Sequence, residues 1–331
     1  MAVSEPPSID DFSPSGGTLV LRWFCWTIVV CLFAFLVNVY LNYWLGWPGT
    51  PTLFARTGLD PSQIVLYGLA VVIPLGLVLT TSRRSLRRDS LAMGAIAAYI
   101  VRAAFWTVFL VGIADTAISF LRVEGLLPAL IGQGLTEDLG RSRFRGPYVH
   151  LPLIALSLVI SAFSRTLGFT WLALLVVLAE FAIVISRFVF SYEQAFMGDL
   201  VRFWYGGLFL FSSAYTLLED GHVRVDVLYA GFRDRTKGLV NAIGALLLGI
   251  PLCWVVLAVG FGQRSSIITN PLLTIEVSQS GFGMYVKYLL AAFLAIFAIS
   301  MMIQFAAYIL EGVADIRGDP GKRRAAPAAA H

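Results

Sequence analysis

The sequence predicts an all-α integral membrane protein with about eight transmembrane helices. Hydrophobic residues make up 58% of the 331 residues and charged residues only 13%, whereas soluble domains carry about a quarter charged residues. Apolar runs of about 20 residues, long enough for a helix to cross a bilayer, recur along the chain. The alternation of polar and apolar residues that is typical of an outer-membrane β-barrel is missing.

Four spans are predicted in the first 168 residues. They cover residues 19–47, 63–81, 91–121 and 148–163. The third run is longer than a span needs, and we expect it to begin as an interfacial segment. The fourth run has only 16 residues, which is short for a span, so a re-entrant or interfacial segment is the alternative there.

Four further spans are predicted in the C-terminal half, where we expect them to form a four-span core. They cover residues 169–190, 203–218, 238–261 and 284–312. Beyond residue 312 the chain ends in a basic tail, residues 313–331, which we expect to be disordered and cytoplasmic.

Short amphipathic surface helices are predicted on both sides of the span at 203–218. At residues 192–202 and 222–235, apolar residues recur at the spacing of one helix face, and charged residues lie around them. Helices of this kind lie in the membrane interface and anchor a bundle there.

Four arginines provide the strongest topology signal. Arg83, Arg84, Arg87 and Arg88 lie within six residues, and such clusters hold a loop on the cytoplasmic side. We therefore expect both termini in the cytoplasm. Residues 1–18 lack the positive segment of a signal peptide, so the first apolar run is expected to remain as a span.

The sequence gives little support to catalysis. It contains three His and three Cys residues, and the Cys residues all fall inside apolar runs. Walker, GxSxG and HExxH motifs are missing. The net charge of +4 reflects loop arginines rather than a nucleic-acid-binding surface. We expect no enzymatic activity, no cofactor or metal, and no nucleic-acid partner.

Ionisable residues inside spans leave a second function class open. Arg102, Asp115 and Glu180 fall within predicted spans, and such groups are candidates for an ion or substrate pathway. A stand-alone secondary carrier is therefore the alternative hypothesis. The competing interpretation is that these groups bond one another or a partner subunit.

An ordered set of motifs runs through residues 169–312. The motifs are Arg187-Phe188-Val189-Phe190, Glu193 with Asp199, residues 206–215, residues 220–226, Glu276-Val277-Ser278 and Gln304. This set resembles the small membrane subunit, the DctQ-type component, of tripartite ATP-independent periplasmic (TRAP) transporters. It covers somewhat under half of the chain, and residues 1–168 look like an N-terminal extension of extra spans whose role is open.

The resemblance implies a non-catalytic scaffold in a bacterial inner membrane. In that family the small subunit packs against a large membrane subunit that carries out elevator-type, sodium-driven uptake. A periplasmic binding protein delivers the substrate, typically an organic acid. Both proteins and the membrane lipids are therefore expected partners. The candidate residues for contacts with partners or lipids are Arg187, Glu193, Asp199, His222, Arg224, Asp226, Glu276, Ser278 and Gln304.

Overall fold

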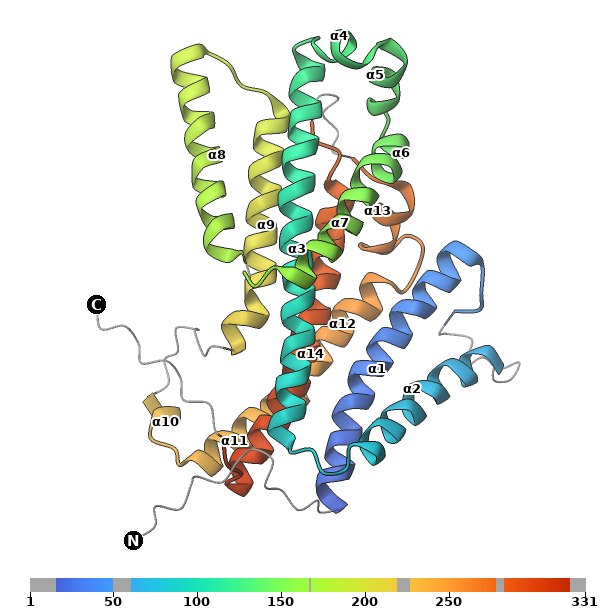
Figure 1. Ribbon diagram of the computed structural model, residues 1–331, viewed down its shortest axis with the longest axis vertical. Helices are drawn as coiled ribbons and strands as arrows, with labels where there is room; N and C mark the ends of the chain where they lie inside the picture. The colour runs from blue at the N-terminus through green and yellow to red at the C-terminus, as the bar shows by residue number, and fades with distance from the viewer. Residues whose placement is uncertain (1–15, 50–60, 167, 219–226, 278–282, 322–331) are drawn as a thin grey trace. The chain divides into compact units, whose positions relative to one another are not determined.

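The structure, a computed structural model, describes residues 16–49, 61–166, 168–218, 227–277 and 283–321 (Figure 1). Throughout these residues the chain forms helices joined by short loops, without a strand. This confirms the prediction of an all-α integral membrane protein.

Seven helical stretches in the described residues are long and apolar enough to cross a membrane. Their lengths run from 20 to 38 residues, compared with about 20 needed for a span. They are α1 (Gly16–Leu45), α2 (Pro61–Thr80), α3 (Leu86–Val123), Ser142–Phe163, α8 (Phe169–Phe190), Asp234–Gly260 and α14 (Lys287–Arg317).

The fourth of these stretches is longer than its apolar run. The helix begins in α6 (Ser142–Arg145), continues through a π-helical turn, η2 (Gly146–His150), and ends in α7 (Leu151–Phe163). Its 22 residues are sufficient for a span, whereas the predicted 16 were short. The residues between the predicted third and fourth spans also contain two short helices, α4 (Leu127–Ile131) and α5 (Gln133–Leu139).

One predicted boundary is wrong. The surface helix at 192–202 and the span at 203–218 form a single helix, α9 (Ala195–Leu218), because the apolar spacing continues unbroken through the polar residues Asp199 and Arg202. These charges and the Gly, Ser and Tyr residues of α9 keep it outside the seven apolar stretches. The expected eight spans thus become seven candidates and α9.

The second predicted surface helix is also corrected where the structure describes it. Residues 219–226 lie outside the described residues. Among the residues that the structure describes, α10 covers Val227–Ala230, and after a break a new helix, α11 (Asp234–Gly244), begins the next span. A helix continuous to residue 235 is therefore not formed.

Two π-helical turns precede prolines inside spans. η2 ends two residues before Pro152, and η3 (Ala245–Gly249) ends two residues before Pro251 at the start of α12 (Ile250–Gly260). A proline lacks the N–H group that would bond the preceding turn and its ring crowds a carbonyl there. A widened turn just ahead accommodates both defects without ending the helix.

The chain divides into two compact units. One contains residues 1–97, 216–255 and 301–331, and the other contains residues 98–215 and 256–300. In the first unit α1 and α2 lie side by side (Figure 1). The predicted domain boundary at 168/169 rests on sequence resemblance alone and stays a prediction.

Close packing of α3, α9 and α14 forms the core of the second unit. A Cβ atom on Gly112 of α3 would lie 2.4 Å from Nε1 of Trp204 on α9, so only glycine allows the indole to approach. That indole donates a hydrogen bond to the Val108 carbonyl at 3.2 Å. The Phe293 ring on α14 lies 5.2 Å from Phe203 and 4.8 Å from Phe211, between ring centroids.

Candidate functional site

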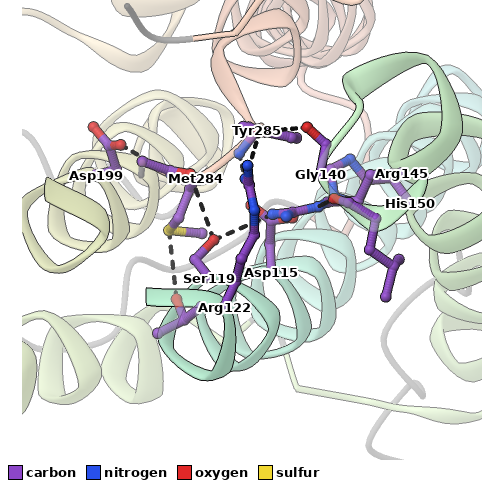
Figure 2. A network of polar contacts seen from close by, with 12 residues as sticks. Asp115, Ser119, Arg122, Gly140, Arg145, His150, Asp199, Met284 and Tyr285 are labelled. Carbon is purple, nitrogen blue, oxygen red and sulfur yellow. Dashed lines mark hydrogen bonds and ion pairs between the residues drawn. The ribbon is translucent and has the colours of Figure 1, made fainter. Parts of the chain in front are cut away.

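A buried carboxylate, Asp115 of α3, lies at the centre of the polar network in Figure 2. Its Oδ1 accepts hydrogen bonds from Nη1 of Arg145 at 2.9 Å and from Nε2 of His150 at 3.0 Å. Its Oδ2 accepts the backbone N–H of Tyr285 at 2.7 Å. A buried charge is tolerated only when it is paired and hydrogen-bonded, and Asp115 meets both conditions.

The principal counter-charge is Arg145, which is also fully buried. Its Nε donates to the Leu139 carbonyl at 2.9 Å, and its Nη1 also donates to the hydroxyl of Ser119 at 3.1 Å. The guanidinium carbon lies 4.1 Å from the centre of the Tyr285 ring, a cation–π arrangement. Nη2 is the one nitrogen of this guanidinium without a hydrogen bond within the described chain.

The network holds the short non-helical segment, residues 283–286, that leads into α14. Ser119 donates to the Gly283 carbonyl at 3.5 Å, and Asp199 of α9 accepts the Met284 N–H at 3.0 Å. The hydroxyl of Tyr285 donates to the Gly140 carbonyl at 2.8 Å and accepts from Arg122 at 2.7 Å. Backbone polar groups of this non-helical segment are satisfied in this way.

His150 connects the carboxylate to α14. Its Nδ1 lies 2.9 Å from the hydroxyl of Tyr288, and the two rings are stacked with an interplanar angle of 15°. With a proton on Nε2 the imidazole donates to Asp115, and Nδ1 can then accept the Tyr288 hydroxyl. The Asp115 carboxylate thus favours the tautomer with the proton on Nε2, and this tautomer leaves Nδ1 free to accept from Tyr288.

The geometry of this network suits a structural role, in which it joins helices, rather than catalysis. Asp115, Arg145 and His150 are each fully buried, and their polar atoms face one another. No group of three or more His, Cys, Asp or Glu side chains able to hold a metal ion occurs in the part of the chain that the structure describes. The network ties α3, residues 139–150, α9 and the start of α14 together.

Two of these residues were not found from the sequence. Arg145 falls between two predicted spans, and His150 lies at the start of a short apolar run. Asp115 was recognised as an unusual intramembrane charge, and Asp199 as part of a family motif. Their partners are 30 to 170 residues away along the chain, so spacing carried no signal for them.

The other predicted contact residues form separate local pairs. Arg187 and Glu193 make an exposed ion pair of 3.4 Å, and Glu276 pairs with Lys287 at 2.5 Å. Gln304 is buried in the part of α14 that belongs to the first unit, whereas the Asp115 network lies in the second. His222, Arg224, Asp226 and Ser278 lie outside the described residues.

A further local contact lies in the loop between α8 and α9. The hydroxyl of Tyr192 donates to Glu124 at 2.5 Å. Burial and the neighbouring Glu124 carboxylate raise the pKa of Tyr192 to about 12, so the hydroxyl remains a donor at neutral pH.

The three charges of the alternative carrier hypothesis do not share a site. Arg102 donates to the Ser161 carbonyl at 3.3 Å, whereas Asp115 belongs to the closed network. Thirteen residues of one helix separate the two, which is about 20 Å along the axis. Glu180 is exposed on α8.

Together, the membrane-spanning helices and the closed ion-pair network define a helical integral membrane protein whose central buried charges are used internally. Residues 174–315 match the family described as tripartite ATP-independent periplasmic transporters, DctQ component. This part of the chain, somewhat under half of it, is a DctQ-type region, as the sequence motifs predicted. Comparisons with curated proteins and with solved structures found no match.

Proposed function

We propose that this chain is the non-catalytic small permease subunit of a TRAP transporter. It acts as the membrane scaffold for a large elevator-type subunit in sodium-driven uptake of an organic acid, which a periplasmic binding protein delivers. The observation that carries the proposal is the DctQ match over residues 174–315. The protein resides in a bacterial inner membrane with both termini in the cytoplasm.

The buried network supports a scaffold role. A scaffold has to keep its shape while a neighbouring subunit moves. Breaking a buried ion pair is costly because it leaves an uncompensated charge, and two such pairs join α3 to residues 139–150. Hydrogen bonds add α9 and the segment that leads into α14. Both oxygens of Asp115 are occupied by partners within the chain, which disfavours a transport pathway through Asp115.

The surface of α8 supports a partner subunit. Leu172 is the buried residue of this 22-residue helix, and Phe181 and Phe188 are 60% and 79% exposed. Lipid would cover such apolar side chains equally well. Glu180 favours a protein partner over lipid. An ionised carboxylate that faces hydrocarbon has a high free-energy cost, and intramembrane charges are normally paired. We assign this face to the large subunit, with a cationic side chain opposite Glu180.

Co-purification tests this proposal. The full chain, co-expressed with a tagged large TRAP subunit, should be recovered with it. Glu180→Lys should lower that recovery roughly tenfold or more, because two like charges at an interface cost several kcal/mol. Glu137→Lys, a charge reversal at an exposed residue of α5, is the matched control and should leave recovery unchanged.

Each failure has a separate meaning. No recovery of the unmodified chain would contradict the scaffold function itself. Normal recovery of Glu180→Lys beside the unmodified chain would contradict only the assignment of α8 to the interface.

A further inference from the structure

An open pocket of about 490 Å³ lies where α2 ends and α3 begins. Three arginines and three hydroxyl-bearing residues line it, and all six belong to one compact unit. The lining consists of Thr80, Thr81, Ser82, Arg83, Arg84 and Arg88. These residues precede the region that matches the DctQ family, so the family relationship assigns them no role.

A buried arginine of α1 fixes the turn that carries the pocket. Arg22 is fully buried, and its Nη1 donates to the Thr81 and Ser82 carbonyls at 2.9 and 3.4 Å. Its Nη2 donates to the hydroxyl of Thr81 at 2.9 Å, and its Nε to Asp89 at 2.6 Å. One guanidinium therefore holds the end of α2 against the first turn of α3.

The fourth arginine of the cluster points away from the pocket. Arg87 is 3% exposed and bonds two acidic side chains of α14, Glu311 and Asp315. It also donates to the carbonyls of Asp319 and Pro320, both at 2.8 Å. The arginine run is thus divided: Arg87 anchors the start of α3 from the inside, and the other three surround the pocket.

The charge around the pocket is positive. Arg83 and Arg88 have exposed side chains. Arg84 lies 3.9 Å from Asp89, which is already paired with Arg22, so its charge is partly compensated. Guanidinium groups present planar forks that match phosphate oxygens, and nearby hydroxyls add further donors.

We propose that this pocket binds a phosphate-bearing anion, the headgroup of an anionic phospholipid. The position favours a lipid over a soluble phosphate compound. α2 is a candidate span, and Val72, Ile73 and Leu79 are each more than half exposed along it, so acyl chains can cover this surface. The pocket follows directly at Thr80, the last residue of the helix, at the level where headgroups meet a span.

Native mass spectrometry of the full chain in mild detergent tests the proposal with phosphatidylglycerol as the probe and phosphatidylcholine as the neutral lipid. The unmodified chain should retain phosphatidylglycerol preferentially. The triple variant Arg83→Gln/Arg84→Gln/Arg88→Gln should bind it roughly 100-fold more weakly, since each arginine near an anionic headgroup contributes about fivefold. Arg143→Gln/Arg235→Gln/Arg264→Gln removes the same charge at exposed sites elsewhere and should bind normally.

Competition identifies the source of the phosphate. Inorganic phosphate that displaces the lipid from the unmodified chain would indicate a site for soluble anions as well, whereas lipid retained in its presence indicates a headgroup site. Equal binding by the pocket variant and the control variant would overturn the proposal. Should the triple variant fail to fold, the single variants Arg83→Gln and Arg88→Gln, each at an exposed side chain, should still weaken binding roughly fivefold. Unchanged binding in both would also overturn it.

Discussion

Asp115→Asn should lower the free energy of unfolding by about 3–5 kcal/mol, the usual cost of breaking a buried ion pair. The amide keeps the size of the side chain but removes the charge that compensates Arg145, and it replaces one of two accepting oxygens with a donor. Both partners are fully buried, so neither can recover its bonds from water. Thermal and denaturant unfolding of the full chain in mild detergent, followed by far-UV circular dichroism, measures the loss.

Asp138→Asn is the matched control for this prediction. Asp138 pairs with Arg141 at 3.3 Å, but both side chains are exposed, so the change should cost no more than about 1 kcal/mol. Adding Arg145→Met to Asp115→Asn should recover part of the lost stability, because it removes the stranded charge. Equal losses for Asp115→Asn and Asp138→Asn would mean that the network does not stabilise the protein.

Gly312→Ala should also destabilise the protein, by about 1–3 kcal/mol, the range for overpacking a close contact. A Cβ atom on Gly312 of α14 would lie 2.6 Å from the carbonyl oxygen of Gly238, and one on Gly238 of α11 would lie 2.5 Å from that of Gly312. The two backbones therefore touch, as at small-residue crossings of membrane helices. An added methyl group forces the helices apart, and the same unfolding measurement detects it.

The control lies on the same helix as one of the crossing residues. A Cβ atom on Gly244 would meet nothing within 4 Å, so Gly244→Ala should be neutral or stabilise α11 by about 0.5–1 kcal/mol, since alanine restricts the unfolded chain more than glycine does. Effects of the same sign and size at Gly312 and Gly244 would contradict the close crossing.

The sequence predicted spans best where a long apolar run has sharp ends. The span expected at 169–190 matches α8 residue for residue, and both flanking residues, Gly168 and Ser191, have a left-handed backbone conformation that ends a helix. The prediction failed where a helix continues from charged residues into an apolar run. In α9, charged residues at the start indicated a surface helix, yet the backbone stays helical from Ala195 through to Leu218.

The candidate site was only partly predictable, for a related reason. A lone Asp inside an apolar run is conspicuous, and the expectation that central charges bond one another holds for Asp115. Its partners come from residues 145, 150 and 285, and no periodicity connects such distant positions. The division of the arginine run into one inward and three pocket-lining side chains likewise depends on packing against Glu311 and Asp315.

We propose that this chain supports transport without performing it, and uptake into proteoliposomes tests this role. Vesicles would contain this chain alone, the large TRAP subunit alone, or both, each with the periplasmic binding protein, a sodium gradient and radiolabelled organic acids. We expect uptake with both subunits and none with this chain alone. Sodium-driven uptake by this chain alone would contradict it.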